Sequence, residues 1–330
     1  FFDYDNDGLQ DIIITYVDNT HRVYKNLGGS KFEDVTNIAN LGGEGLVGGP
    51  ATVFDYDNDG DLDIFVANGS TFQYLDKPEH LIPQNDRLFR NDGKGTFTDV
   101  AESVGIAALP LRVGRGVAFG DYDNDGTLDL YVASYHQLGP EDNQGSGEGL
   151  RLFPAVASFL GYEHDAEHAR LYRGDGRGGF ADVSLDMGLD DVTLAMGSNF
   201  GDLDNDGWLD FYLGTGYPYF DGLMPNLMYR NDGGRRFTDV TIPGGFGHLQ
   251  KGHGVVFADL DRDGDQDVFE QMGGGFYADA FGNVLFENPG GEGHWVKLRL
   301  QGTTSNRSAV GAHVRVVVGK EKDERSLYRT

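Results

Sequence analysis

Five nine-residue segments of the chain carry aspartate at their first, third, fifth and ninth positions and glycine at the sixth. They are residues 3–11, 55–63, 121–129, 202–210 and 259–267, and they are called loops 1 to 5 from here on. Four carboxylates within so short a segment repel one another strongly unless a cation lies among them. Hard oxygen donors in this number suit calcium, which accepts about six to eight oxygen ligands in flexible geometry. We therefore predict a calcium ion in each loop, about five Ca2+ sites in all.

The spacing assigns a role to each loop position. The aspartates are the side-chain ligands, the glycine lets the chain turn sharply around the ion, and position seven offers its backbone carbonyl. Position four is Asn in four loops and Arg262 in loop 5, where we expect only a local rearrangement because this position is not a ligand. The predicted metal ligands are Asp3, Asp5, Asp7, Leu9 and Asp11; Asp55, Asp57, Asp59, Asp61 and Asp63; Asp121, Asp123, Asp125, Thr127 and Asp129; Asp202, Asp204, Asp206, Trp208 and Asp210; and Asp259, Asp261, Asp263, Asp265 and Asp267.

Two other interpretations of the loops fit less well. Asp, Asn and Gly are ordinary turn residues, but a turn needs one or two of them rather than four carboxylates at fixed odd spacing. A helical EF-hand needs an acid at position twelve, and only loop 5 has one, Glu270. Short β-branched and aromatic runs flank the loops, for example residues 51–54 and 64–66 around loop 2, and such runs predict a β-hairpin.

A second repeated sequence motif lies between the loops and predicts two more strands in each repeat. It reads LFRNDGKGTFTDVA from Leu88, with variants starting at Val23, Leu171 and Met228 and a weaker one at Leu285. Asn-Asp-Gly between runs that carry aromatic residues is a hairpin-turn signal. Four short antiparallel strands repeated around an axis describe the blade of a β-propeller. We predict an all-β fold, with a propeller over residues 1–288 and a truncated small β-domain over residues 289–330.

Strand direction sorts the connections onto two faces. The calcium loops and the Asp-Gly turns must share one face, and the long inserts must share the other, because strands alternate in direction. The inserts cover residues 68–86, 135–170, 215–226 and 272–283. They carry many aromatic side chains: Phe72, Tyr74, Phe159, Tyr162, Tyr217, Tyr219, Phe220, Phe276, Tyr277 and Phe281. Function tends to lie on such loops above a rigid scaffold, so we expect a protein or glycan ligand on the face opposite the calcium loops.

The amino-acid composition and net charge argue against several classes of partner and of binding site. The chain of 330 residues has a net charge of −27, which argues against a nucleic-acid partner and against an anionic membrane surface. It contains no cysteine, so disulfides and thiolate zinc sites are excluded, and calcium would take their place as a clamp. No apolar run approaches the roughly 18 residues of a membrane span. The chain opens on Phe1 directly before loop 1, so we expect a fragment whose first hairpin lacks most of its leading strand.

The repeated FxDYDNDGxLDLYVA and LYRNDGxGxFTDVT lines resemble the FG-GAP/VCBS repeats of integrin-α-like β-propellers. Residues 294–314 are similar to the start of an ASPIC/UnbV domain, in particular the Ser-Asn-Arg and Gly-Ala pieces. Together they resemble the cartilage acidic protein/UnbV family, with a bacterial branch expected. The resemblance implies a secreted or surface calcium-binding propeller, with a periplasmic location as the alternative, and it brings no enzymatic activity. After a boundary at residues 288–291 we expect a strand at residues 295–300 and another at 310–318.

The remaining clusters carry weaker signals. His164 and His168, four residues apart with acids between them, would suit zinc on a helix, but no third ligand is identifiable and a solvated loop is the better interpretation. No nucleophile elbow or acid–base pair is recognisable. We expect a non-enzymatic extracellular binding or adhesion module with structural calcium. The alternatives are a carbohydrate-active lyase or hydrolase and a targeting domain of a larger enzyme.

Overall fold

The protein is described here by a computed structural model that covers residues 1–16, 21–41, 48–68, 85–106, 114–134, 158, 160, 168–189, 191–216, 224–274, 281–290, 294–302, 309, 312–319 and 324–329. Within these ranges the chain forms six β-sheets and a four-residue helix, α1 (Thr36–Ala39), and residue 158 is also helical. The predicted all-β class is therefore confirmed. The aromatic inserts fall almost entirely outside the described ranges, as do His164 and most of its neighbours.

The strands follow one another within each sheet in chain order. Sheet 1 contains β1 (Ile12–Ile14), β2 (Arg22–Asn26) and β3 (Phe32–Asp34). Sheet 2 contains β4 (Gly48–Phe54), β5 (Asp63–Asn68), β6 (Arg87–Asn91) and β7 (Phe97–Asp99). Sheet 3 contains β8 (Gly114–Gly120), β9 (Asp129–Ser134), β10 (Arg170–Gly174) and β11 (Phe180–Asp182). Sheet 4 contains β12 (Ala195–Gly201), β13 (Asp210–Thr215), β14 (Leu227–Asn231) and β15 (Phe237–Asp239). Sheet 5 contains β16 (Gly252–Ala258), β17 (Asp267–Met272) and β18 (Val284–Phe286), and β19 (Val314–Val318) pairs with β20 (Arg325–Arg329).

Loops 2 to 5 each join the first two strands of a sheet. The pairing runs up to the loop, with Phe54 opposite Asp63 in sheet 2 and Gly120 opposite Asp129 in sheet 3. In loop 1 the equivalent contact is a single bridge between Phe2 and Asp11. Strands on both sides of the loops confirm the β-hairpin and rule out the helical EF-hand.

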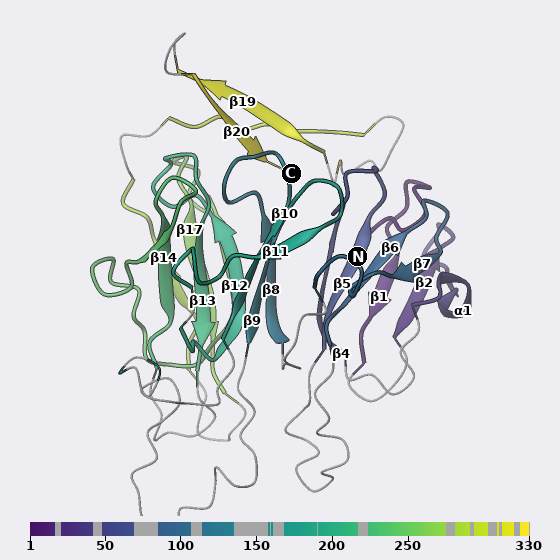
Figure 1. Ribbon diagram of the computed structural model, residues 1–330, viewed down its shortest axis with the longest axis horizontal. Coiled ribbons are helices and arrows are strands. Elements are labelled where there is room, and N and C mark those ends of the chain that lie inside the picture. Colours follow the sequence, from purple (N-terminus) through teal and green to yellow (C-terminus); the bar gives the residue numbers. More distant parts are fainter. Residues whose placement is uncertain are drawn as a thin grey trace, which may run out of the picture.

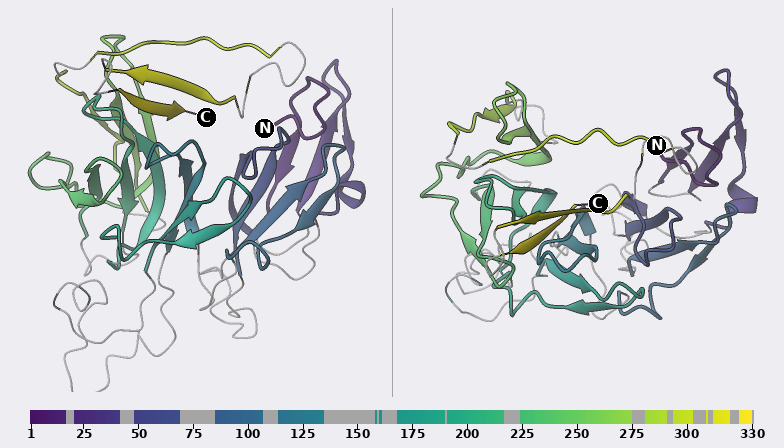
Figure 2. Two further views of the ribbon diagram at one scale, coloured as in Figure 1. Left: turned by 45° about the horizontal axis from the view of Figure 1, so that its top comes forward. Right: turned by 90° about the horizontal axis from the view of Figure 1, so that it is seen from above.

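Sheets 1 to 5 stand around a common axis, as the view from above shows (Figure 2, right). The first strands of sheets 2 to 5 lie side by side near that axis, where β4 is next to β8, β8 next to β12 and β12 next to β16. The backbones approach so closely that a Cβ on Gly197 would overlap the carbonyl oxygen of His253 in the next sheet. Radial sheets with touching inner strands are the architecture of a β-propeller, as predicted.

The core lies between neighbouring sheets. Every residue of β5, β9 and β13 is buried, because each of these strands has a sheet on both sides. Aromatic rings bridge the sheets: Tyr131 and Phe211 lie 4.9 Å apart between centroids, and Phe54 and Phe119 lie 5.4 Å apart. Burying aromatic rings of this size supplies much of the apolar driving force for a fold. The propeller therefore holds the loops on a rigid base.

The C-terminal segment departs from the prediction at one point. Residues 294–302 are extended and largely exposed, and they form no strand, so the expected strand over residues 295–300 is wrong. The segment crosses the space between sheets 1 and 5, where no described strand runs beside it to complete a ladder (Figure 2, right). The second expected strand is present as β19, and the β19–β20 hairpin lies over the loop-bearing face of the propeller (Figure 1).

Candidate metal centre

The first aspartate of loops 1 to 3 shapes each loop. In loop 1 the two carboxylate oxygens of Asp3 accept the backbone N–H groups of Asp7 and Gly8 at 3.0 and 2.8 Å. Asp55 and Asp121 accept the equivalent pairs in loops 2 and 3. The residues at positions four and six adopt left-handed backbone conformations, with φ of 57° at Asn6 and 86° at Gly8. These conformations let the loop curl around its first aspartate. The loops thus fold locally around their own first carboxylate.

The ninth aspartate anchors loops 1 to 4 to the end of the second strand after the loop, which is β2, β6, β10 or β14, and it anchors loop 5 to Asn288, just beyond β18. Asp63 is fully buried, and it accepts the backbone N–H of Tyr56 at 3.1 Å and that of Asn91 at 2.8 Å. The same two bonds recur at position nine in the other loops. This structural role at position nine was not visible in the sequence.

The structure brings three carboxylates of every loop together, with their ligand oxygens within 4.8 Å of one another. In loops 1 to 3 these are positions one, three and nine: Asp3, Asp5 and Asp11; Asp55, Asp57 and Asp63; Asp121, Asp123 and Asp129. In loops 4 and 5 they are positions one, three and five: Asp202, Asp204 and Asp206; Asp259, Asp261 and Asp263.

The remaining predicted ligands lie beside these clusters. Asp7, Asp59 and Asp125 each accept the N–H of position seven. Asp210 and Asp267 hold only the anchoring bonds of position nine. At position seven, Asp61 accepts the amide of Asn6 at 2.8 Å and Thr127 donates to the Gly174 carbonyl at 3.1 Å. The backbone-carbonyl role of Leu9, Thr127, Trp208 and the two aspartates at this position stays a prediction.

Several clustered oxygens are buried and accept no hydrogen bond. They are Oδ1 of Asp5, Asp57 and Asp123 at position three of loops 1 to 3, and Oδ1 of Asp202 and Asp259 at position one of loops 4 and 5. An unsatisfied buried oxygen is costly, and the cost is greater for a charged group. A bound cation would satisfy one such oxygen in every loop. The donor set therefore fits a hard divalent ion.

Burial raises the pKa of several carboxyl groups in loops 2 and 3, and neighbouring carboxylates add to the effect. The pKa of Asp121 is raised to about 7, that of Asp123 to about 6 and that of Asp63 to about 8. Burial raises the pKa of Asp129 well above its ordinary value. Such groups resist ionisation at neutral pH unless a positive charge compensates them.

A basic side chain on the second strand after the loop lies near that loop in sheets 1 to 3, a contact that the sequence pattern did not reveal. Lys25 forms ion pairs with Asp5 and with Asp7, the latter at 3.1 Å, and the bond to Asp5 raises the pKa of the lysine. Arg90 and Arg173, in the matching places, act electrostatically on Asp57 and Asp123 and oppose the rise in their pKa. These cations balance part of the loop charge.

In sheets 2, 4 and 5, an asparagine at or just beyond the end of the third strand ties the loop of that sheet to the preceding loop. The Nδ2 of Asn91 donates to the Tyr4 carbonyl of loop 1 at 2.8 Å and to Leu62 of its own loop at 3.0 Å. Asn231 and Asn288 repeat this pattern on loops 3 and 4. The recurring Asn before the Asp-Gly turn was the available signal for these bonds. It was interpreted only as part of a turn.

Position four links consecutive loops in the forward direction. Asn6 reaches Asp61 of loop 2, and the Nδ2 of Asn124 donates to the Gly207 carbonyl of loop 4 at 2.9 Å. Arg262 of loop 5 keeps the left-handed conformation of the asparagines, with φ of 70°.

Comparison with known families and proteins agrees with this geometry. The family described as FG-GAP-like repeat matches residues 3–66, 81–132 and 220–270. Cartilage acidic protein 1 of Mus musculus is 38% identical over 71 residues, which are 22% of this chain and 11% of that protein. The protein of that name from Homo sapiens is 43% identical over 49 residues, 15% of this chain and 7% of that protein. The matches thus span a small part of these relatives. The ASPIC/UnbV start and the bacterial branch stay predictions.

Solved structures with a similar course of the chain are distant in sequence. One is an Agrocybe aegerita lectin described as recognising non-reducing terminal N-acetylglucosamine. Its TM-score is 0.46 at 18% sequence identity, and the alignment covers 96% of this chain and 70% of the lectin chain. A rhamnogalacturonan lyase of Bacillus licheniformis gives 0.35 at 17% identity, covering 79% and 42%. The propeller assignment rests on the sheets themselves. Within the described residues, no helix has the length and apolar character needed to cross a membrane.

Proposed function

Because the chain belongs to the family of FG-GAP-like repeat proteins, we propose that loops 1 to 5 bind calcium and that the ions stabilise a propeller acting as an extracellular binding or adhesion module. One observation carries the proposal: each loop contains a buried carboxylate oxygen that no protein group satisfies, beside two further carboxylates. A calcium ion would supply the missing positive charge at that point. Loop residues of the chain would hold it, with Asp3, Asp55 and Asp121 shaping loops 1 to 3.

The metal part of the proposal is tested by counting bound ions. Chelator-treated protein is dialysed against calcium at constant ionic strength, and bound calcium is measured by atomic spectroscopy. We expect about five ions per chain, with dissociation constants of ~10⁻⁴–10⁻³ M as in extracellular modules. Magnesium at the same concentration is the control, because it dehydrates reluctantly and demands near-octahedral geometry. Fewer than one calcium ion per chain at 10 mM would contradict the proposal.

We further propose that the module binds a protein or glycan ligand on the face opposite the loops and does not act as an enzyme. The net charge of −27 supports a partner other than nucleic acid. A glycan array, followed by product analysis of each bound glycan, tests this. Retention without cleavage supports the binding module. Release of a shortened glycan would instead identify a lyase or hydrolase.

A further inference from the structure

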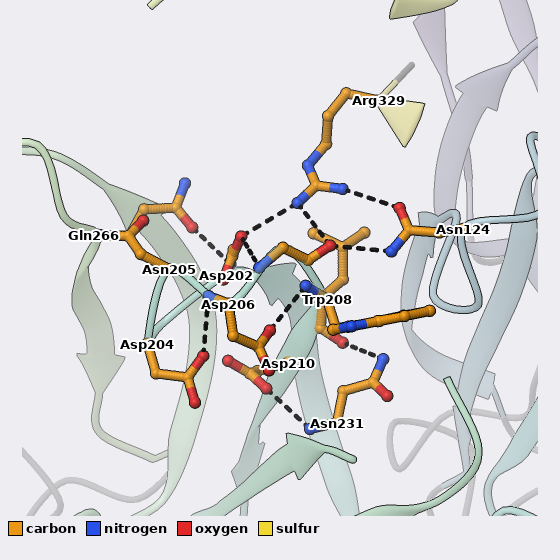
Figure 3. A network of polar contacts seen from close by, with 12 residues as sticks. Asn124, Asp202, Asp204, Asn205, Asp206, Trp208, Asp210, Asn231, Gln266 and Arg329 are labelled. Atoms are coloured by element: carbon orange, nitrogen blue, oxygen red, sulfur yellow. Dashed lines mark hydrogen bonds and ion pairs between the residues drawn. The ribbon is translucent and has the colours of Figure 1, made fainter. Parts of the chain in front are cut away.

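The last strand of the chain lies across loops 3 and 4 (Figure 3). The guanidinium of Arg329 donates to Oδ2 of Asp202 at 3.1 Å, to the Gly207 carbonyl at 3.3 Å and to Oδ1 of Asn124 at 3.4 Å. The backbone N–H of Tyr328 donates to the same Asn124 oxygen at 3.0 Å. A single arginine thus joins β20 to the metal cluster of loop 4 and to the neighbouring loop.

Loop 4 lacks a hydrogen bond that loops 1 to 3 possess. In those loops two backbone N–H groups, from positions five and six, fix both oxygens of the first aspartate. In loop 4 the N–H of Asp206 donates instead to Asp204 at 3.2 Å, and only Gly207 still donates to Asp202, at 3.0 Å. Arg329 donates to that same Oδ2 of Asp202, while Oδ1 is left buried and without a donor.

We propose that Arg329 is a positioning residue for the metal site of loop 4, holding Oδ2 of Asp202 so that Oδ1 faces the cluster with Asp204 and Asp206. The inference rests on the proposed calcium binding. Arg329 does not contact the ion. It adds a second donor to the Asp202 oxygen that Gly207 already binds, and partners of this outer kind fix the orientation of metal ligands.

Charge balance explains why a cation from the C-terminal segment suits this place. Loop 4 carries four aspartates, and a divalent ion neutralises half of their charge. Arg329 and Arg325, whose guanidinium donates to the Asp206 carbonyl at 2.6 Å, balance the remainder. Residues 294–330 hold eight lysines and arginines against three acids, in a chain of net charge −27. Lys297 makes a similar approach to Asp259 of loop 5, at 3.4 Å.

A consequence is that metal binding and docking of the β19–β20 hairpin support each other. If Arg329 strengthens metal binding at loop 4, the metal must strengthen the hold of loop 4 on the hairpin by the same factor. Leu327 also approaches Gly207 so closely that a Cβ there would lie 2.7 Å from a methyl carbon of the leucine. The hairpin would therefore report on the occupancy of the loop beneath it.

Terbium luminescence, excited through tryptophan, measures the site in the whole protein. The chain contains two tryptophans: Trp208 at position seven of loop 4, and Trp295, which lies against Gly264 of loop 5. In a Trp295→Phe background, the component of the signal that Asp204→Ala removes belongs to loop 4. Terbium affinity, and calcium affinity by displacement, are then compared for the parent, Arg329→Gln and Arg329→Lys.

We expect Arg329→Gln to weaken the loop 4 affinity about tenfold, since outer-shell substitutions cost roughly 10–100-fold, and Arg329→Lys to recover part of the loss. The matched control is Arg315→Gln on β19, because this arginine contacts Ser326 and Tyr328 within the hairpin and, among the described residues, forms no hydrogen bond or ion pair with a loop. It removes the same charge and should leave the affinity unchanged. Hydrogen exchange of β20 should slow on adding calcium in the parent and in Arg315→Gln, but not in Arg329→Gln.

The outcomes separate the two proposals. If the parent protein shows no loop 4 signal that Asp204→Ala removes, calcium binding itself is wrong. If the parent binds and Arg329→Gln binds equally well or more tightly, the positioning role is wrong while the metal site stands. Equal losses in Arg329→Gln and Arg315→Gln would also overturn the role, because they would reflect general charge or a loosened hairpin.

Discussion

Asp123 shows at the scale of one side chain why the loops need a cation. One of its oxygens is buried without a hydrogen-bond donor, and burial together with neighbouring Asp125 raises its pKa to about 6. An ionised Asp123 therefore destabilises the metal-free fold and stabilises the metal-bound one. The same side chain acts in opposite directions in the two states.

Replacing Asp123 by Asn should separate those two effects. We expect Asp123→Asn to lower the melting temperature in calcium, because a ligand is lost, and to leave it unchanged or raise it in chelator, because repulsion is relieved. Bound calcium should fall by one ion per chain. Asp186→Asn, which removes an exposed acid, is the control with the same change of charge. A drop of equal size in both conditions would show that Asp123 is a packing residue only.

The raised carboxyl pKa values predict an unusual dependence of stability on pH. A carboxyl group whose pKa is higher in the folded than in the unfolded protein stabilises the fold at low pH and loses this contribution as pH rises. For Asp121 and Asp63, with pKa raised to about 7 and about 8, the loss falls between about pH 4 and 8. In chelator the melting temperature should therefore fall across this range.

Calcium should reverse this trend, because it binds the ionised carboxylates. The difference in melting temperature between calcium and chelator should grow steadily from pH 5 to pH 8. Scanning calorimetry at four pH values in each condition measures it. A difference that is independent of pH would mean that the ion does not compete with protons for these groups.

At the scale of the element, an asparagine rather than sheet pairing holds the hairpins of sheets 2, 4 and 5 to the preceding loop. Asn231 is buried and donates to Tyr122 of loop 3 and Leu209 of loop 4. Sheet 3 has Gly174 in the corresponding place, where a Cβ would lie 2.3 Å from the Leu128 carbonyl oxygen. The tie between loops 2 and 3 is therefore missing at that position.

Removing the tie should cost stability without removing a metal ligand. Asn231→Ala leaves the carbonyls of Tyr122 and Leu209 without this donor, and we expect a loss of about 2–6 kcal/mol from the free energy of unfolding, at ~1–3 kcal/mol for each unsatisfied group. Denaturant unfolding in excess calcium measures it, with exposed Arg235→Ala of the same turn as the control. A change below about 0.5 kcal/mol would mean that water replaces the asparagine.

The hairpins could be predicted because their signal is local. The spacing of the aspartates, the glycine at position six and the flanking β-branched residues all lie within about twenty residues of one another. Together they determine the loop and its two strands. Contacts between elements leave no such signal. The bond from Asn231 to Tyr122 spans 109 residues and that from Arg329 to Asp202 spans 127. The prediction of a strand at residues 295–300 was wrong for the same reason. The alternation of apolar and charged residues there does not reveal whether a partner strand lies beside them.

At the scale of the whole molecule, the described sheets form an open arc whose middle members are covered on both faces and whose last member is covered on one (Figure 2). Phe65 of β5 and Phe269 of β17 occupy the same place in their repeats, two residues after the ninth loop position. The first is 0% exposed and the second 36% exposed. Position in the arc, rather than residue type, decides the difference.

This matched pair predicts unequal costs of truncation. We expect Phe65→Ala to lower the free energy of unfolding by about 3–5 kcal/mol, as for a fully buried phenylalanine, and Phe269→Ala to cost less than half as much. Denaturant unfolding of the two variants in calcium gives the comparison. Equal losses would indicate that another surface covers Phe269 in solution.

The central claim is that divalent ions in the five loops stabilise the propeller, and thermal unfolding in calcium and in chelator tests it most directly. At 10 mM calcium a site with a dissociation constant of ~1 mM contributes about 1.4 kcal/mol, so five sites give about 7 kcal/mol. For a chain of this size that corresponds to a melting temperature raised by about 10 °C. Superimposable melting curves in 10 mM calcium and in excess EDTA would contradict the account.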